Sequence, residues 1–213
     1  MTGKLIVFEG VEGCGKTTQL HKTHEWLKSL SRPVILTREP GGTSLGTDLR
    51  QLLLNKDTKQ PIYDVTELLL YAADRAQHVE ELLKPELAKG TIVLCDRYVD
   101  STVAYQGYGR GLSLALITQL NQIATRGLES DLTIWLDIDV AVSLARKQQD
   151  ESDRIEQEKI EFHRRVQQGY TELAQAKCDQ IVRVDANCSK TEVHKQIQQI
   201  LLQRFPEIKS QTF

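Results

Sequence analysis

The chain has 213 residues, of which 26% are charged and 40% are hydrophobic, and its formal net charge is -2. This composition is that of an ordinary soluble globular protein, and the balanced charge gives no indication of a nucleic-acid-binding protein. A chain of this length can bury one substantial core. We therefore expect a single α/β domain over residues 1–213, with a short lid at about 146–158.

The N-terminus and the cysteines indicate the compartment. Only four apolar residues, at positions 5–8, precede Glu9, which is too short a run for a signal-peptide core or a membrane span. The four cysteines, at positions 14, 95, 178 and 188, contain neither a CxxC pair nor a Cys/His ligand spacing, which argues against a disulfide framework and a structural zinc site. We expect a cytoplasmic protein with reduced thiols, three of them buried.

Five short apolar runs alternate with helical stretches along the chain. They are rich in Val, Ile and Leu and lack regular polar alternation, which is typical of parallel strands buried on both faces. They span residues 4–9, 33–38, 91–96, 131–137 and 180–185. The clearest helical pattern is residues 64–83, where apolar side chains recur every three or four positions. This order predicts an α/β fold with a five-stranded parallel sheet between layers of helices.

The first strand leads into a phosphate-binding loop (P-loop). Residues 10–17 read Gly-Val-Glu-Gly-Cys-Gly-Lys-Thr and fill every position of the pattern G-x-x-x-x-G-K-[ST], between a strand and a helix. In such a loop, backbone N–H groups and the helix N-terminus face phosphate oxygens, the lysine neutralises the β- and γ-phosphates, and the Thr hydroxyl binds Mg²⁺. The sequence therefore predicts ATP binding by Gly10, Val11, Glu12, Gly13, Cys14, Gly15, Lys16, Thr17 and Thr18.

Two side chains inside the loop carry further information. The carboxylate of Glu12 would be repelled by bound phosphates unless it faces a metal ion or a hydroxyl of the substrate, so Glu12 is a candidate for such a contact. The alternative is a loop carboxylate that faces solvent. Cys14 stands at a variable position and is expected to fill space, although a helix N-terminus could also lower its pKa.

A P-loop alone does not distinguish switches, motors and kinases. A GTPase reading is disfavoured because residues 55–58, Asn-Lys-Asp-Thr, end in Thr where a guanine-binding NKxD motif needs Asp, and because the sequence contains no DxxG. Motors and DNA-processing ATPases normally have longer chains. A kinase that phosphorylates a small acceptor is the reading that the remaining motifs favour.

The third strand ends in Asp96, Arg97 and Tyr98. The carboxyl end of a parallel strand faces the crevice beside the P-loop, so Asp96 can hold Mg²⁺ directly or through water. Arg97 follows into the same crevice and can bind an acceptor phosphate with two parallel N–H groups. A salt bridge at the end of the strand is the alternative.

Three further segments could bind the acceptor. Arg38 leaves the second strand at a turn rich in Pro and Gly. Tyr71 and Arg75, at positions i and i+4 of the helix over 64–83, share one face, where a ring can stack on a pyrimidine and a guanidinium can donate to its carbonyl. An amphipathic helix with a half-buried Tyr and a surface Arg explains the pair equally well. Side chains at 101, 102 and 106 could bind a base edge or sugar, or cap and solvate a helix.

Taken together, these motifs resemble those of bacterial thymidylate kinases (dTMP kinases), which have a three-layer P-loop NTPase fold. The resemblance spans nearly the whole chain and rests on residues 8–18, 37–43, 70–75, 96–98 and 104–107. It implies that Tyr71 stacks on thymine, that Arg75 contacts its exocyclic oxygen and that Arg97 binds the acceptor phosphate. It assigns the phosphate and magnesium end to Arg38, Glu39 and Arg50, the base and sugar to Ser101, Thr102 and Gln106, and further substrate contacts to Pro40 and Tyr105. The chain departs from the family at Tyr71 and Cys14, where Phe and Ala are usual.

The segment 146–158 carries many charges and few apolar residues, which suits an excursion over the surface. Some members of the family carry a catalytic arginine inside the P-loop, at the position that Gly13 occupies here. Asp153-Arg154-Ile155-Glu156 matches the lid motif of the family, so the resemblance implies that Arg154 contacts the transferring phosphoryl group and that Arg146 helps to hold ATP. On composition alone, a solvated loop explains the charges.

The expected reaction is transfer of the γ-phosphoryl group of ATP to dTMP, giving dTDP for dTTP biosynthesis, with Mg²⁺ and with Lys16, Arg97, Arg154 and Glu12 in catalysis. The resemblance also implies a homodimer, and we expect no nucleic-acid or membrane partner. Two alternatives remain: another nucleotide kinase with a different acceptor pocket, and a P-loop regulatory protein that binds nucleotide without phosphorylating a metabolite.

Overall fold

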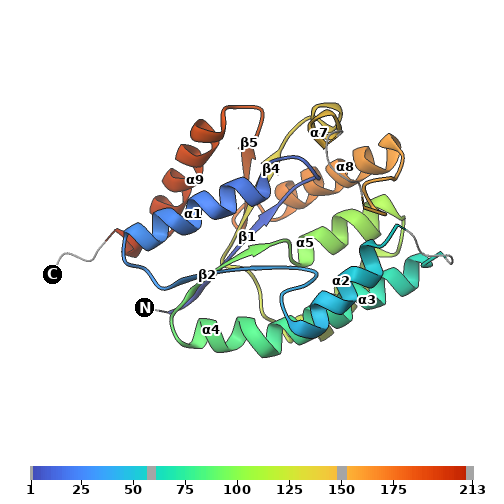
Figure 1. Ribbon diagram of the computed structural model, residues 1–213, viewed down its shortest axis with the longest axis horizontal. Coiled ribbons are helices and arrows are strands. Elements are labelled where there is room, and N and C mark those ends of the chain that lie inside the picture. The colour runs from blue at the N-terminus through green and yellow to red at the C-terminus, as the bar shows by residue number, and fades with distance from the viewer. Residues whose placement is uncertain (1, 57–60, 148–152, 210–213) are drawn as a thin grey trace.

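The centre of the molecule is a five-stranded sheet in the order β2-β3-β1-β4-β5, and all of its pairings are parallel (Figure 1). The structure is a computed structural model that describes residues 2–56, 61–147 and 153–209. The strands are β1 (Lys4–Glu9), β2 (Val34–Arg38), β3 (Ile92–Asp96), β4 (Leu132–Asp137) and β5 (Ile181–Asp185). The predicted sheet is confirmed, and four of its strands begin one residue later than expected.

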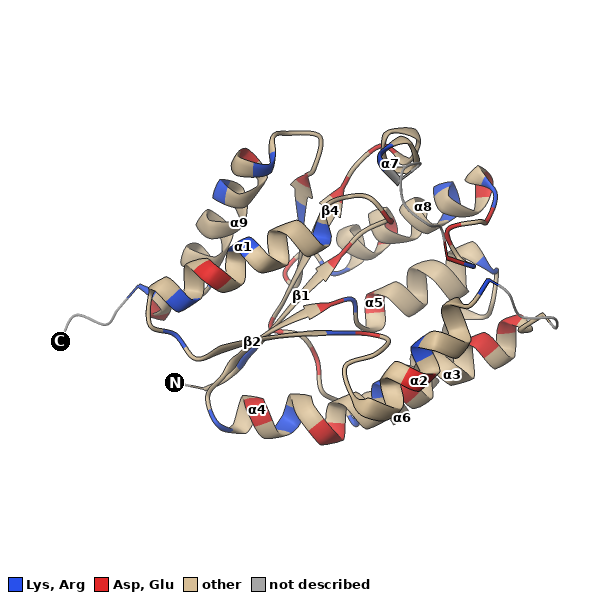
Figure 2. Cartoon of the chain, viewed as in Figure 1, with Lys and Arg blue, Asp and Glu red and all other residues tan. Residues whose placement is uncertain are grey.

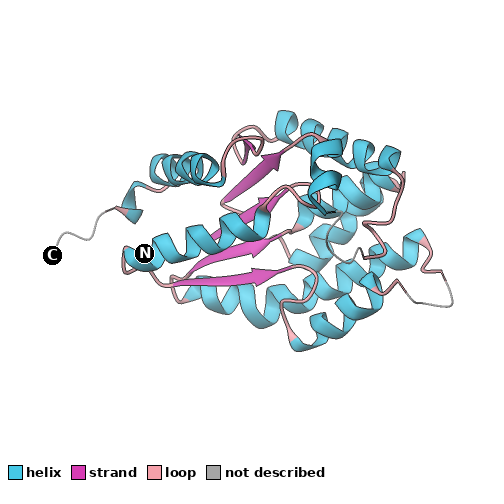
Figure 3. Cartoon of the chain, turned by 45° about the horizontal axis from the view of Figure 1, so that its top comes forward, coloured by secondary structure: helices cyan, strands magenta, loops and turns pink. Residues whose placement is uncertain are grey.

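Helices cover both sides of the sheet (Figure 3). The α-helices of the described residues are α1 (Lys16–Ser29), α2 (Ser44–Leu54), α3 (Asp64–His78), α4 (Lys84–Ala88), α5 (Val99–Thr102), α6 (Leu114–Thr125), α7 (Val140–Lys147), α8 (Ile160–Ala176) and α9 (Lys190–Arg204). Two π-helical segments, η1 (Val79–Leu83) and η2 (Val103–Gly109), continue α3 and α5, and a 3-10 turn η3 (Pro206–Ile208) follows α9. The helical pattern over 64–83 is thus confirmed as α3 and η1.

The central strand β1 shows why the sequence lacks polar alternation. Its side chains alternate between two buried clusters: Ile6 and Phe8 pack with residues of α1 and α9, whereas Leu5 and Val7 pack with residues of η1. Because helices bury both faces of the strand, every side chain between Leu5 and Glu9 lies in the interior. Helices α4 and α9 carry residues of both charges (Figure 2).

The register of the sheet brings three strand ends together. Phe8 of β1 and Arg38 of β2 both pair with Asp96 of β3. The residues that follow, which include the P-loop, therefore leave the sheet at the same edge. In open parallel sheets, ligands bind in the crevice outside the carboxyl ends of the strands.

The four cysteines are free thiols, as expected, but the expectation that three of them are buried is wrong. Cys14 and Cys95 are buried, Cys188 is half-buried and Cys178 is exposed. Cys178 lies in the turn between α8 and β5, where the chain runs along the surface. Within the described ranges, no helix is both long enough and apolar enough to cross a membrane.

Candidate active site

A cavity of about 930 Å³ opens at the carboxyl ends of β1, β2 and β3. Its volume lies in the upper part of the range for small-molecule sites. All site residues predicted from the sequence line it except Gly10, Val11 and Arg154. The lining includes P-loop residues, the turn after β2, one face of α3, the segment after β3 and residues of the lid motif. The structure therefore brings the predicted donor and acceptor residues into one space.

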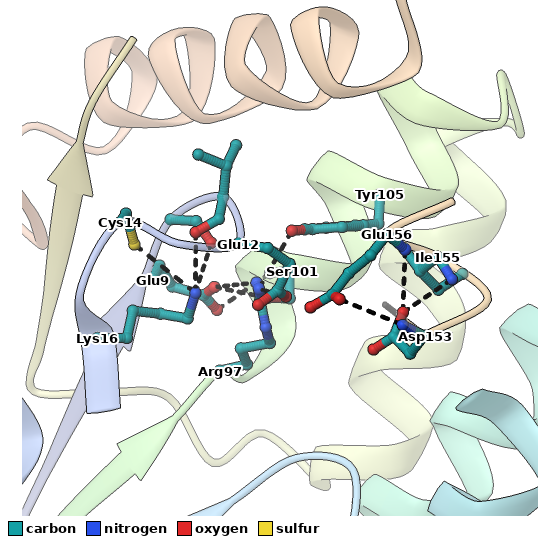
Figure 4. A network of polar contacts seen from close by, with 12 residues as sticks. Glu9, Glu12, Cys14, Lys16, Arg97, Ser101, Tyr105, Asp153, Ile155 and Glu156 are labelled. Atoms are coloured by element: carbon teal, nitrogen blue, oxygen red, sulfur yellow. Dashed lines mark hydrogen bonds and ion pairs between the residues drawn. The ribbon is translucent and has the colours of Figure 1, made fainter. Parts of the chain in front are cut away.

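The P-loop owes its shape to its glycines. Gly10, Gly13 and Gly15 have φ values of 140°, 73° and 96°, a region that side chains disfavour. A Cβ atom on Gly10 would lie 2.6 Å from the carbonyl oxygen of Leu136. The ammonium group of Lys16 lies inside the loop, where it donates to the carbonyl oxygens of Gly10 (3.0 Å) and Val11 (3.1 Å) (Figure 4).

Cys14 fills space in the loop. Its side chain is buried, and the ammonium nitrogen of Lys16 lies 3.7 Å from its sulfur. Burial raises the pKa of the Cys14 thiol, because the positive charge of Lys16 opposes the desolvation of the thiolate without overcoming it. The alternative of a thiol with a lowered pKa is therefore wrong.

Arg97 is held on every side at the mouth of the crevice. Its Nη1 atom donates to Ser101 Oγ (3.1 Å) and Tyr170 OH (3.2 Å), its Nη2 atom donates to Tyr105 OH (3.1 Å) and to the Glu12 carboxylate, and its guanidinium lies 4.9 Å from the centre of the Tyr105 ring. Burial is the largest single influence and acts to lower the pKa of Arg97, but the carboxylate of Glu12 and the other electronegative groups around it together raise the pKa well above its usual value. Arg97 therefore stays charged.

Glu12 points toward the acceptor side of the loop. Its carboxylate accepts from Arg97, while its backbone carbonyl accepts from Ser143 Oγ of α7. The carboxylate of Glu12 is therefore tolerated beside a phosphate site because it faces the positive charge of Arg97 (Figure 4).

Asp96 and Thr17 provide oxygen ligands at the edge of the P-loop. Both line the cavity, and Asp96 Oδ1 is buried and has no hydrogen-bond partner among the described residues. A carboxylate and a hydroxyl suit Mg²⁺, which usually takes one or two protein oxygens and completes its shell with phosphates and water. The described residues contain no group of three or more His, Cys, Asp or Glu side chains that could form a metal cage. The site thus fits Mg²⁺ shared with a nucleotide.

Arg75 is the centre of the predicted acceptor side. It is only 2% exposed, so the alternative of a surface arginine on an amphipathic helix is wrong. Its guanidinium donates to Glu39 Oε2 (2.7 Å), Thr102 Oγ1 (2.8 Å), Asn121 Oδ1 (2.7 Å) and the carbonyl oxygen of Tyr98 (2.9 Å). These contacts join three segments, the turn after β2, the stretch from Tyr98 to Thr102, and α6, around one side chain.

Tyr71 and Glu39 complete this wall of the cavity. Tyr71 lies one turn before Arg75 on α3 and is half-buried. Burial, with a smaller contribution from the carboxylate of Glu67, raises the pKa of the Tyr71 phenol, which is therefore neutral at physiological pH. Glu39 also accepts from His78 Nδ1 (2.8 Å), so its carboxylate faces two basic side chains.

Arg154 lies beside the cavity and is attached to α3. Its Nη2 atom donates to the fully buried carboxylate of Glu67, and its Nε atom donates to the carbonyl oxygen of Leu53 (2.9 Å). Glu67 also accepts from Gln106 Nε2 (2.8 Å) and Arg110 Nη2 (3.2 Å). The lid arginine is therefore anchored to a carboxylate rather than surrounded by solvent. Residues 148–152 of the predicted lid lie outside the described residues.

Sequence reasoning missed one end of the cavity. The start of α1 and the turn between β5 and α9 form it, with Gln19, Ala186, Cys188, Ser189, Lys190 and Val193 in the lining. Gln19 Nε2 donates to the carbonyl oxygen of Lys190 (3.0 Å) and joins the two segments. The signal was present, because this turn follows the carboxyl end of a parallel strand.

Comparison with known proteins decides the family. The model of the thymidylate kinase family matches residues 8–197. The chain belongs to the thymidylate kinase family. It is 66% identical to the thymidylate kinase of Nostoc sp. strain PCC 7120 over 203 residues, which cover 94% of this chain and 96% of the relative. It is 58% identical to the thymidylate kinase of Trichodesmium erythraeum over 224 residues, covering 98% and 99%.

A solved structure of the same family supports the fold. The crystal structure of thymidylate kinase from Ehrlichia chaffeensis aligns with a TM-score of 0.79 at 32% identity, over 94% of this chain and 100% of that chain. The thymidylate kinase family and the P-loop fold, both expected from the sequence, are thereby confirmed.

Proposed function

We propose that the protein catalyses the reaction of its family, transfer of the γ-phosphoryl group of ATP to dTMP, and supplies dTDP for dTTP synthesis. The observation that carries the proposal is one cavity lined at one end by the P-loop with Lys16 and, beside it, by Arg97, Tyr71 and Arg75. A nucleotide-binding regulatory protein needs the P-loop and Lys16, but it does not need Arg97, Tyr71 and Arg75 beside them. Residues 1–213 act as a single domain in this proposal.

The donor end binds ATP through backbone N–H groups of residues 10–18, with Arg146 at its rim. Lys16 faces the β- and γ-phosphates and offsets the charge that develops between them. Thr17 and Asp96 would hold Mg²⁺ directly or through water, and the ion would neutralise phosphate charge there. The adenine base of ATP lies toward the end of the cavity that is formed by α1 and the turn between β5 and α9.

The acceptor end fixes dTMP for in-line attack. Tyr71 stacks on the thymine ring, and the network around Arg75 presents N–H and hydroxyl groups to its edge. Arg97 binds the 5′-phosphate, with Arg38 and Arg50 contributing positive charge nearby. The acceptor phosphate is already a nucleophile at neutral pH, so positioning and charge neutralisation provide the catalysis and no general base is required.

Arg154 stabilises the transferring phosphoryl group in this proposal. It leaves Glu67 and enters the cavity when both nucleotides are bound, because the added phosphate charge attracts it. Exclusion of water by the lid then limits hydrolysis of ATP.

An ADP-release assay tests the proposal. ATP is offered with dTMP, dUMP, UMP, CMP, AMP or GMP, and dTMP is expected to give the highest kcat/KM. Equal rates on all acceptors would contradict the acceptor assignment, and ADP release that no acceptor stimulates would point to a regulatory protein instead. Omission of Mg²⁺ is expected to abolish the rate.

A homodimer is part of the proposal, and one apolar surface supports it. Large exposed hydrophobic side chains gather on three helices that pack side by side, α2, α3 and α6. They are Leu45, Leu52, Val65, Leu69, Leu114, Leu116 and Ile123. Surfaces of this kind mark interfaces. Sedimentation of the wild type and of Leu69→Asp is expected to give a dimer and a monomer, respectively.

The remaining expectations concern location and other partners. Four free thiols suit a reducing compartment, and we place the protein in the cytoplasm with ATP and dTMP as its small-molecule partners. We propose no nucleic-acid or membrane partner. Fractionation of cells that express a tagged chain tests the location.

A further inference from the structure

Glu9 is a buried carboxylate at the carboxyl end of β1, directly before the P-loop, and it is 0% exposed. Its Oε1 atom accepts from the backbone N–H groups of Tyr98 (2.9 Å) and Ser101 (3.1 Å). Its Oε2 atom accepts from Ser101 Oγ (2.6 Å) and Tyr170 OH (2.7 Å). Four donors from two other parts of the fold therefore converge on one carboxylate.

Such a carboxylate is unfavourable in the interior unless its oxygens are fully hydrogen-bonded. Burial raises the pKa of Glu9, and the nearby positive charge of Arg97 counteracts that shift. Glu9 does not itself line the cavity, so it does not meet a substrate. Its partners, however, are the residues that surround Arg97.

The two hydroxyl groups that donate to Glu9 also contact Arg97. Ser101 Oγ and Tyr170 OH accept from Arg97 Nη1 at 3.1 and 3.2 Å, respectively. Each hydroxyl has a single hydrogen atom, and a carboxylate can only accept. Because both hydroxyls donate to Glu9, the lone pairs of their oxygens are left for the N–H groups of Arg97. Figure 4 shows Glu9, Ser101 and Arg97 of this network. The buried carboxylate thus sets the direction of the hydrogen bonds that fix the Nη1 side of the guanidinium.

Glu9 also holds the backbone of this segment. Arg97 has a φ of 72°, in the left-handed region that a side chain such as Arg disfavours. The backbone N–H groups that donate to Glu9 belong to Tyr98, the residue after Arg97, and to Ser101, four residues after Arg97. The same carboxylate therefore secures both the strained turn and the side chain that it carries.

We propose that Glu9 is a positioning residue for the acceptor phosphate. By holding Nη1 of Arg97 through Ser101 and Tyr170, it leaves Nη2 directed into the cavity, where Nη2 contacts the more exposed carboxylate of Glu12. The phosphate of the acceptor takes the place of Glu12 on Nη2, while the Nη1 contacts persist. This inference rests on the proposed function of Arg97.

Glu9→Gln tests the proposal with a side chain of the same shape. The NH₂ group of the amide must face either the backbone N–H groups of Tyr98 and Ser101, where donor meets donor, or the hydroxyls of Ser101 and Tyr170. In the second case the hydroxyls must accept from the amide, so their hydrogen atoms point away from position 9 and their lone pairs are no longer free for Arg97. We expect kcat/KM for dTMP to fall about 30-fold or more through a raised KM, with the KM for ATP within about twofold of wild type. A merely structural defect would affect both substrates alike.

Tyr170→Phe is the second variant, in case Glu9→Gln does not fold. It removes one hydroxyl and keeps the carboxylate, and is expected to lower kcat/KM for dTMP about 3- to 10-fold. If Tyr170 acts through the same network, the double variant Glu9→Gln/Tyr170→Phe loses little more than Glu9→Gln alone. The control is Ile208→Val, a buried change in η3 far from the network, which is expected to lower the thermal midpoint by a few degrees and leave both KM values unchanged.

Two results would overturn the proposal. The first is a wild-type kcat/KM for dTMP in either a folded Glu9→Gln or Tyr170→Phe. The second is an equal loss of kcat/KM for dTMP and for ATP. Measuring the wild type with dTMP first separates this failure from failure of the proposed function. An inactive wild type would reject the acceptor assignment, whereas an active wild type with unaffected variants would reject only the role of Glu9.

Discussion

The two ends of the cavity are built in opposite ways. The P-loop is one continuous segment of eight residues, 10–17, whose binding groups are mostly backbone N–H groups and whose shape depends on glycines with positive φ. The predicted acceptor end is assembled from side chains of α3, η2, α6 and the turns after β2 and β3, joined by the hydrogen bonds and the buried ion pair of Arg75. Arg97, through its contact with Glu12, is its link to the P-loop. The donor site is therefore encoded locally, and the acceptor site is a product of the whole fold.

This difference predicts how each end responds to change. A substitution in the P-loop should alter chemistry with little effect on the rest of the molecule, because few distant side chains depend on the loop. A substitution in the acceptor network should alter stability and substrate binding together, since the same hydrogen bonds serve both. The following predictions test the contrast, from the largest effect to the smallest.

Lys16→Ala is expected to show the isolated chemical effect. The ammonium is the side-chain cation inside the loop, so its loss should lower kcat about 10³-fold or more, with dTMP binding nearly intact. ADP release gives kcat, and calorimetry gives the affinity for dTMP. A kcat within tenfold of wild type would show that the loop does not depend on this charge.

Arg154→Ala should lower kcat strongly, about 10²- to 10³-fold, if the arginine reaches the transferring phosphoryl group. Binding of dTMP should change little, because Arg154 does not line the cavity and is held by Glu67. The matched control is Arg164→Ala, which removes the same charge from an exposed position of α8. An unchanged kcat for Arg154→Ala would remove it from the mechanism.

Arg75→Met should destabilise the fold as well as weaken dTMP binding. Among the residues that the structure describes, it leaves the buried carboxylate of Glu39 with only His78 as a basic partner, and breaking a buried pair in this way costs about 3 kcal/mol or more. Denaturant unfolding measures the loss. Adding Glu39→Gln removes the unpaired charge and should restore part of the stability but not the affinity for dTMP. If the single variant unfolds like wild type, the network is not a source of stability.

The same contrast explains what sequence reasoning could and could not supply. Apolar runs and the P-loop are local signals, so the five strands were located to within one residue. The burial of Arg75 was not readable from α3 alone, because Asn121, 46 residues away, and the carbonyl of Tyr98 provide two of its partners. Helical spacing identifies which residues share a face but not what that face meets.

The anchoring of Arg154 and the far end of the cavity were missed for the same reason. Glu67 precedes Arg154 by 87 positions, and nothing in the sequence around Glu67 indicates that it is the partner of Arg154. Gln19 and Lys190 are separated by 171 positions. Only the rule that strand ends share one edge could have placed the turn after β5 near the P-loop. Long-range side-chain pairing, rather than element order, is the part that the folded chain adds.

The smallest predicted effect concerns pH and tests whether the acceptor network stores unfavourable charge. Burial, and then the nearby carboxylate of Glu39, raises the pKa of Asp74 to about 6, while its Oδ1 atom accepts from the N–H of Gly41 at 3.0 Å. A carboxyl with a raised pKa in the folded state contributes stability when protonated. That contribution is complete below the pKa of the unfolded chain, near 4, and is lost as the pH rises through about 6.

Asp74→Asn keeps the shape and the acceptor for Gly41 but cannot ionise. Relative to wild type, the variant should therefore gain about 1 kcal/mol in unfolding free energy between pH 5 and pH 7.5, as wild type loses the contribution of its protonated carboxyl. Urea unfolding at the two pH values measures the gap. A gap that is constant with pH would mean that Asp74 is no less readily ionised in the fold than in the unfolded chain, and a gap that changes the other way would mean that the ionised carboxylate is stabilised by Arg75 and His78. The first outcome would show that the positive charges of the acceptor network balance its carboxylates and their burial at this position, and the second would show that the positive charges dominate.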